Sequence, residues 1–233
     1  MENSRLKNSA LNFASGFAGR VLTILLNFIV RTIFIHCLNE AYLSVNGLYS
    51  NILTVLSLAE LGFGSAMVYR MYAPVAVNDY QKTAALLHFY KKIYAIIGVV
   101  IFGLGLCVIP FMDYIIKDKP DVSGLTLYYI LFLINTTVSY WFASYKASVL
   151  YADQKEYVKT NAQNATAILQ SILQIVLLLI FRKYFLYLLV QLGCNIFLNL
   201  YVAHLVDKRY PELKKHRKAH LGTEEREQIK KDA

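Results

Sequence analysis

The sequence predicts an all-α, polytopic membrane protein: one lobe of six transmembrane helices followed by a basic tail. Two observations lead to this prediction. Hydrophobic residues make up 57% of the 233 residues and charged residues only 17%, whereas soluble domains carry about 25% charged residues. The hydrophobic residues also form continuous runs of about 20 residues, the length that a helix needs to cross a bilayer. Membrane barrels show alternating segments of about ten residues instead, so strands are not expected.

Six such runs follow one another along the chain. They cover residues 10–35, 43–71, 93–112, 125–150, 162–181 and 184–206. The four prolines lie at or beyond the predicted helix ends, where a missing N–H does little harm; they are Pro74, Pro110, Pro120 and Pro211. We therefore expect residues 1–206 to form the transmembrane lobe. Residues 207–233 are expected to form a basic cytoplasmic tail or a linker between lobes.

The net charge of +9 is explained by membrane topology. With the N-terminus inside, 17 of the 24 Lys and Arg residues fall on the inner side, four on the outer side and three within the spans. This asymmetry is the positive-inside bias of multi-pass membrane proteins. We expect a protein of the cytoplasmic (inner) membrane with both termini in the cytoplasm. Its basic tail would be attracted to anionic membrane lipid, and no nucleic-acid partner is expected.

Charged residues inside the first two runs give the strongest hint of function. Arg20 and Arg31 lie in the first run, and Glu60 lies in the second. A charge at the bilayer centre costs about 2.5–3.5 kcal/mol even on a mild scale, so such residues pair or face a water-filled cavity. Arg20 and Arg31 are almost three helical turns apart, which places them on one face. Arg20 and Glu60 are expected at similar depth on consecutive antiparallel helices, as neighbours in a structural ion pair or along a transport path.

Further polar residues lie near the ends of the spans and in stripes along them. Arg70 lies near the inner end of the second run, where its side chain can reach the headgroups. The candidates for lining a cavity are Gln170 and Gln174 in the fifth run and Gln191, Asn195 and Asn199 in the sixth. Amide stripes either hold helices together, at about 0.6 kcal/mol per contact, or line a wet cavity, and the sequence leaves both interpretations open. Some of the 18 tyrosines would stack on sugars if they lined a cavity.

Residues 42–74, YLSVNGLYSNILTVLSLAELGFGSAMVYRMYAP, contain the most specific pattern in the chain. The segment LSLAELGFGSA, residues 56–66, places a glutamate, two glycines and a serine in an order that a plain hydrophobic helix would not be expected to have. Together with the opening SRLKNSALNFASG and the RTIF that begins at Arg31, this stretch resembles bacterial polysaccharide flippases of the multidrug/oligosaccharidyl-lipid/polysaccharide exporter superfamily. The resemblance continues more loosely to the basic tail.

The resemblance implies a function. Such flippases move lipid-diphosphate-linked oligosaccharides from the inner to the outer leaflet for cell-surface polysaccharide biosynthesis, in a cavity between two six-helix lobes. Cationic residues of that cavity are thought to hold the diphosphate. The substrate-binding candidates here are Arg20, Arg31, Glu60 and Arg70. Guanidinium groups suit the role because they bind phosphate oxygens bidentately.

The length of the chain departs from the family pattern. The chain holds one lobe, so a second six-helix lobe, from the same longer chain or from a partner, is expected to complete the cavity. The segment from Thr223 to Ala233 resembles a linker towards such a lobe. The expected partners are therefore the lipid-diphosphate-linked oligosaccharide, membrane lipid and the second lobe. No cofactor is expected.

Three alternatives remain. A drug or cation antiporter of the same superfamily would need more intramembrane carboxylates than Glu60. A membrane-embedded lipid-modifying enzyme would need clustered carboxylates for acid–base or metal chemistry, and the acidic residues of the outer loop, Asp113, Asp118 and Asp121, lack metal-ligand spacing. We therefore expect no enzymatic activity and no metal site. A structural scaffold would lose only stability when Arg20 or Glu60 is neutralised.

The histidines and cysteines give no sign of a reactive site. Cys37, Cys107 and Cys194 are scattered and form no CxxC pair, so they are interpreted as small apolar packing residues. His216 and His220 lie four residues apart among the lysines of the tail, which favours a solvated face. His88 lies near the end of a span, with no partner visible in the sequence.

Overall fold

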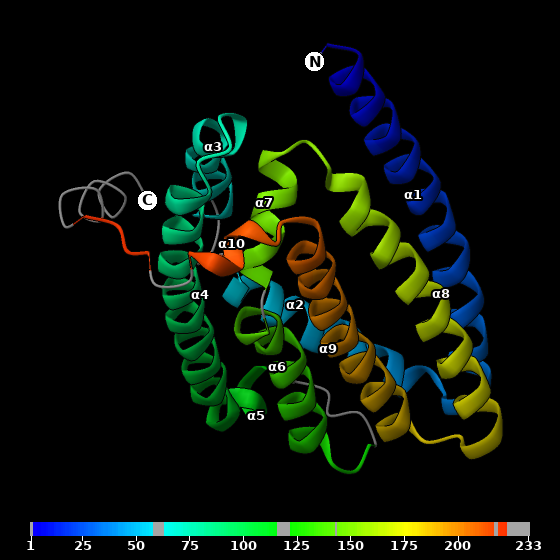
Figure 1. Ribbon diagram of the computed structural model, residues 1–233. Helices are drawn as coiled ribbons and strands as arrows, with labels where there is room; N and C mark the ends of the chain where they lie inside the picture. The colour runs from blue at the N-terminus through cyan, green and yellow to red at the C-terminus, as the bar shows by residue number, and fades with distance from the viewer. Residues whose placement is uncertain (1, 58–62, 116–121, 143, 217–218, 223–233) are drawn as a thin grey trace.

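The computed structural model describes residues 2–57, 63–115, 122–142, 144–216 and 219–222 (Figure 1). Within these ranges the chain forms helices and turns and contains no strand, which confirms the all-helical prediction. The α-helices are α1 (Glu2–Leu38), α2 (Glu40–Ser57), α3 (Phe63–Ala76), α4 (Tyr80–Val108), α5 (Met112–Ile115), α6 (Leu125–Trp141), α7 (Ala147–Ala152), α8 (Glu156–Phe181), α9 (Tyr184–Arg209) and α10 (Glu212–Lys215). Short 3-10 turns cover Ile109–Phe111 and Ser144–Lys146.

Four segments are long and apolar enough to cross a membrane. They are Leu6–Leu38, Tyr80–Phe111, Glu156–Phe181 and Tyr184–Arg209. A fifth span results if Leu125–Trp141 and Ser144–Ala152, which meet at an angle of 45°, are counted as one. Several long apolar helices of this kind indicate a membrane protein. The predicted number of six spans is not confirmed.

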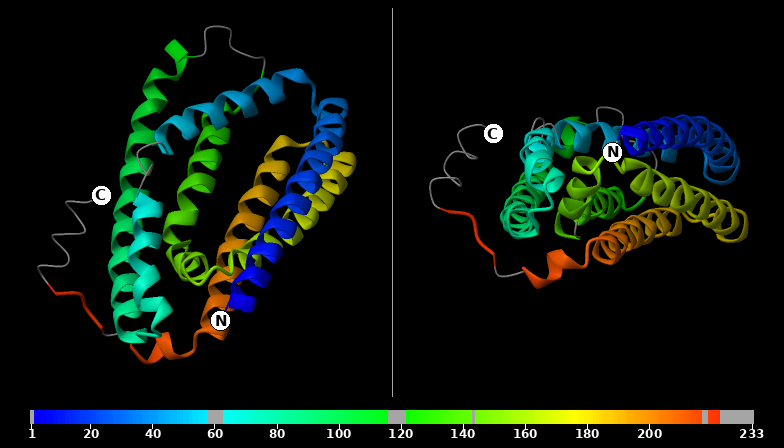
Figure 2. Two further views of the ribbon diagram at one scale, coloured as in Figure 1. Left: turned by 90° about the horizontal axis from the view of Figure 1, so that it is seen from above. Right: turned by 45° about the horizontal axis from the view of Figure 1, so that its top comes forward.

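The predicted second span, residues 43–71, accounts for this difference. In its place, α2 lies across the bundle between α1 and α4, and α3 runs beside α4 (Figure 2). The helix α2 is less apolar than a span because Glu40, Asn46 and Asn51 interrupt its hydrophobic residues. Asn46 is bonded within the protein, since Tyr184 Oη donates a hydrogen bond to its Oδ1 (3.2 Å).

Local capping explains where several helices begin and end. Asp79 Oδ1 accepts a hydrogen bond from the backbone N–H of Lys82 (2.9 Å), and this N-cap allows α4 to begin well before the apolar run at residue 93. Asn39 adopts a left-handed φ of 92° between α1 and α2, a conformation that asparagine tolerates. Pro74 lies in the last turn of α3, two residues before the helix ends at Ala76, which agrees with the expectation of a proline at a helix end.

Close packing of α1 along α8 sets the position of the site. A Cβ on Gly19 would lie 2.3 Å from Asn164 Oδ1, so α1 and α8 approach too closely for a larger residue there. Small residues permit such contacts between membrane helices. Asn164 Nδ2 donates to the carbonyl of Ser15 (3.3 Å), and Asn12 Oδ1 accepts from the backbone N–H of Tyr157 (2.7 Å). These bonds fix the rotation of α1 against α8.

The buried core has two main parts. One joins α2, α6 and α9 around Tyr49, Tyr129 and Tyr184. The other joins α3, α4 and α7 around Met71 and Tyr90. Large hydrophobic side chains on the outer faces of α1 and α8 are exposed, as expected for helices that face lipid.

One end of the bundle, which we call the basic end, gathers cationic side chains. The helices α1, α4 and α8 begin there and α9 ends there (Figure 2). Lys146 pairs with Asp207 at 2.6 Å, and Tyr210 Oη donates to Asp153 Oδ2 (2.5 Å). Burial raises the pKa of the Tyr210 phenol, and the hydrogen bond to Asp153 raises it further. The link between Tyr210 and Asp153 therefore depends on a neutral phenol.

Candidate functional site

A polar groove of about 340 Å³ opens between α1 and α8, beside α2 and α9. We call it the Arg31 groove. Three of the residues proposed from the sequence line it, namely Arg31 from α1 and Gln170 and Gln174 from α8. Thr23, Asn27 and Asn46 add further polar groups. The fold therefore brings together an arginine and two glutamines that are far apart in the sequence.

The polar face of α1 follows from helical spacing. Thr23, Asn27 and Arg31 recur every four residues, which places them one above another. Thr23 Oγ1 is bonded within its own helix, because it donates to the carbonyl of Gly19 (2.8 Å). The side chains of Asn27 and Arg31 are exposed. Arg20 extends the same stripe by one turn and is exposed, but it does not line the groove.

The wall formed by α8 is fixed more firmly. Gln174 is buried and donates through Nε2 to the carbonyl of Tyr187 in α9 (3.4 Å). Ser171 is also buried, and Gln170 is half-buried. Among the described residues that line the groove, Arg31 carries the one formal charge. The groove therefore presents a cation beside fixed amide and hydroxyl dipoles, an arrangement suited to an anion.

The amides of α9 form a different structure. Asn195 Nδ2 donates to the carbonyl (2.7 Å) and to the side-chain Oδ1 (3.1 Å) of Asn135 in α6. Asn199 Nδ2 donates to the carbonyl of Asn195 (2.9 Å), and Ser144 Oγ donates to Asn199 Oδ1 (2.6 Å). This chain joins α9 to α6 and to the turn after it. Gln191 is half-buried two turns before Asn199. The geometry of Asn195 and Asn199 favours the role of holding helices together.

The remaining candidates lie elsewhere. Arg70 is half-buried in α3, outside the Arg31 groove. Residues 58–62 of the LSLAELGFGSA segment, which include Glu60, lie outside the described residues. The expected contact between Arg20 and Glu60 therefore stays a prediction.

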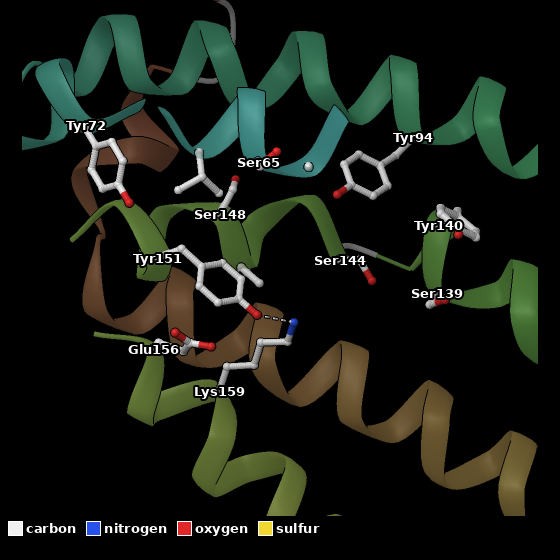
Figure 3. Close-up of a pocket in the computed structure, with 13 residues that line it drawn as sticks. Ser65, Tyr72, Tyr94, Ser139, Tyr140, Ser144, Ser148, Tyr151, Glu156 and Lys159 are labelled. Atoms are coloured by element: carbon white, nitrogen blue, oxygen red, sulfur yellow. Dashed lines mark hydrogen bonds between the residues drawn. The ribbon is translucent and has the colours of Figure 1, made fainter. Parts of the chain in front are cut away.

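A larger pocket of about 590 Å³ lies among α3, α4, the bend between α6 and α7, and the start of α8 (Figure 3). Hydroxyl groups and aromatic rings dominate its wall, with Ser65, Tyr72, Tyr94, Ser139, Ser148 and Tyr151 among the lining residues. Glu156 and Lys159 extend from the first turn of α8, and Lys159 Nζ donates to Tyr151 Oη (2.7 Å). We call this the hydroxyl pocket. Its groups suit a neutral, hydroxyl-rich ligand better than a purely apolar one.

The abundance of tyrosine suggested that some of these residues line a cavity, but the sequence did not identify which ones. Ser144, Ser148 and Tyr151 recur every three to four residues along the polypeptide, which was the one local signal for this wall. In the sequence, Lys159 counts only as one of the inner-side cations, because its hydrogen bond to Tyr151 of α7 depends on the fold. The hydroxyl pocket was therefore missed.

In the part of the chain that the structure describes, no three His, Cys, Asp or Glu side chains gather as metal ligands would. No protein-family model, no curated protein and no solved structure matches this chain. Function must therefore be inferred from the residues themselves.

Proposed function

We propose that this chain is one lobe of a transporter that moves lipid-diphosphate-linked oligosaccharides across the cytoplasmic membrane. The observation that carries the proposal is the Arg31 groove, in which a guanidinium group lies beside Gln170 and Gln174 between two long apolar helices. A guanidinium group offers five N–H donors and binds phosphate oxygens bidentately. The resemblance of residues 42–74 to polysaccharide flippases supports the same class of cargo.

The surroundings of the groove suit an amphiphile. Two exposed apolar side chains on α1 lie about one turn before the polar ones: Ile24 (59% exposed) before Asn27, and Phe28 (73% exposed) before Arg31. An apolar surface therefore borders the charged one. In the proposal, Arg31 holds the diphosphate and the polyprenyl chain lies against this apolar face. The cation at this position disfavours a cationic cargo, and with it the drug or cation antiporter.

The hydroxyl pocket is the proposed contact for the glycan. It borders α8 at Glu156 and Lys159, and the Arg31 groove borders the same helix from Ala167 onward. Lys159 and Ala167 are eight residues apart, which is about 12 Å along a helix. An oligosaccharide attached to a diphosphate has the length to reach from one to the other.

The proposed orientation follows from charge. The basic end would face the cytoplasm, because cytoplasmic segments carry an excess of Lys and Arg. Both chain termini would then be cytoplasmic. A second six-helix lobe would face the Arg31 groove and close the cavity, since one lobe cannot enclose a path alone.

Transport in vesicles tests the proposal. The chain is reconstituted into liposomes that contain a fluorescent polyprenyl-diphosphate glycan, and dithionite, which cannot cross the membrane, reports how much of the lipid reaches the outer leaflet. At a protein density that lets two copies pair, so that the second copy supplies the second lobe, we expect wild type to accelerate movement and Arg31→Gln to abolish most of that acceleration. Lys183→Gln is the matched control. Lys183 is an exposed cation in the turn between α8 and α9, and it does not line the groove. Equal rates for wild type and Arg31→Gln would overturn the proposal.

A further inference from the structure

A third groove lies along α4, where the tail packs against this helix; Figure 1 shows the tail on the side of α4 away from α1 and α8. Its volume is about 460 Å³, and its walls come from α4, from Phe63 and from the tail residues His220 and Leu221. We call it the α4 groove. It shares no lining residue with the Arg31 groove or the hydroxyl pocket.

The α4 wall of this groove changes from basic to apolar along the helix. Its residues recur at intervals of three and four and so form one stripe; they are Ala85, His88, Phe89, Lys92, Ile93, Ile96 and Ile97. His88 and Lys92 lie nearer the basic end, where α4 begins. Ile96 lies eight residues after His88, or about 12 Å further along the helix, and its side chain is 63% exposed. A lysine and a histidine therefore lie at one end of the stripe and apolar side chains at the other.

The tail forms the opposite wall and is anchored there. Leu221 is 6% exposed and belongs to the core cluster of α3, α4 and α7. This anchor holds the imidazole of His220 against that of His88, with ring centroids 5.0 Å apart and planes at 74°. Lys92 is exposed at the same mouth. Among the described residues that line the groove, none is acidic.

We propose that the α4 groove binds one acidic phospholipid of the surrounding leaflet. The phosphate lies against Lys92, His88 and His220, and an acyl chain runs along Ile93, Ile96 and Ile97. Two observations favour a lipid over a soluble anion. The apolar part of the stripe belongs to a helix that is long and apolar enough to span the membrane, and basic pockets at membrane helices are typical sites of anionic headgroups. The site is independent of the proposed transport function.

The bound lipid would also link the tail to the membrane. Because Lys92 belongs to α4 and His220 to the tail, a phosphate between them bridges the two elements. The lipid would thus stabilise the docked position of residues 219–222 on α4.

Native mass spectrometry of the full chain in detergent tests this inference. The probes are dioleoyl-phosphatidylglycerol and dioleoyl-phosphatidylcholine, which have the same acyl chains but differ in net charge. Each lysine near an anionic lipid surface strengthens binding by a factor of about five. We therefore expect the first molecule of phosphatidylglycerol to bind at least about fivefold more tightly than the first molecule of phosphatidylcholine. Lys92→Gln should remove most of this preference.

Lys91→Gln is the matched control, since Lys91 is the exposed neighbour of Lys92 but does not line the groove. It should keep the preference. Ile96→Gln places an amide on the proposed path of the acyl chain without changing charge, at a position that is 63% exposed; it should lower binding of both lipids at this site, which keeps the test informative if Lys92→Gln folds poorly. Equal losses in Lys91→Gln and Lys92→Gln would overturn the proposal in favour of general attraction to charge. Displacement of the lipid by millimolar inorganic phosphate would overturn it in favour of a soluble anion.

Discussion

Replacing Asn195 with alanine tests whether the amide stripe of α9 holds helices together. The change removes two hydrogen bonds to Asn135, at 2.7 and 3.1 Å, and one side-chain acceptor for Asn199 (3.0 Å). Interhelical hydrogen bonds in membranes contribute about 0.6 kcal/mol on average and at most about 1.7 kcal/mol. The two bonds to Asn135 therefore give an expected loss of about 1.2–3.4 kcal/mol in the free energy of unfolding.

The assay is unfolding in SDS, followed by the fluorescence of the single tryptophan, Trp141, which ends α6 close to the network. Gln163→Ala is the matched control, because Gln163 is an exposed amide on α8; its loss should stay within about 0.5 kcal/mol. In a double-mutant cycle, Asn135→Ala removes only the side-chain acceptor, so a coupling of about 0.6 kcal/mol is expected. If Asn195→Ala leaves stability unchanged and instead impairs transport, the amides line a wet cavity and the interpretation as a helix contact is wrong.

Two further predictions concern packing and pH. Gly105→Leu should lower the free energy of unfolding by about 1–3 kcal/mol through overpacking, because a Cβ at Gly105 would lie 2.3 Å from Leu133 Cδ1. Gly103→Leu in the same helix is the control and should be nearly neutral, because nothing lies within 4 Å of a Cβ at Gly103. A loss at Gly103 as large as that at Gly105 would contradict the α4–α6 packing. Burial raises the pKa of Tyr210 above its ordinary value of 10.0, so its contribution to stability is complete below pH 10 and is lost as the pH rises beyond that. Thermal unfolding between pH 9 and 11.5 should therefore show a steeper decline above pH 10 for wild type than for Tyr210→Phe, and parallel curves would contradict a buried neutral phenol.

The membrane-helix character of this chain was predictable because hydrophobic runs record burial in lipid directly. The long helices α1, α8 and α9 coincide with three of the predicted runs. The described helices depart from the six expected spans at the run 43–71, where the hydropathy pattern does not reveal that Asn46 accepts a hydrogen bond from Tyr184 of another helix. A polar residue with such a partner allows α2 to cross the bundle.

The residues of the candidate site were predictable one by one, but their grouping was not. Arg31, Gln170 and Gln174 stood out as polar groups within apolar runs. Their meeting in one groove depends on the close contact of Gly19 with Asn164, which fixes how α1 lies on α8. Asn195 and Asn199 looked equivalent to these glutamines in sequence, yet their neighbours Asn135 and Ser144 place them in helix contacts.

The contact between His88 and His220 could not be predicted from the sequence. His220 was interpreted as part of a solvated tail, and His88 had no visible partner. The structure brings their rings to 5.0 Å from each other because Leu221 is buried against α3, α4 and α7. A single leucine in a charged tail does not predict that contact.

Binding of a polyprenyl diphosphate to the Arg31 groove is the most direct test of the proposed function. The measurement is a titration of wild type, Arg31→Gln and Lys183→Gln with polyprenyl diphosphate and polyprenyl monophosphate, followed by native mass spectrometry. Hydrogen bonds to charged groups contribute about 1.5–3 kcal/mol each, so loss of one such bond should weaken diphosphate binding by about 10- to 150-fold. We expect that loss in Arg31→Gln, a smaller loss with the monophosphate, and unchanged binding in Lys183→Gln. Equal diphosphate affinity in wild type and Arg31→Gln would contradict the assignment of this groove to an anionic lipid headgroup.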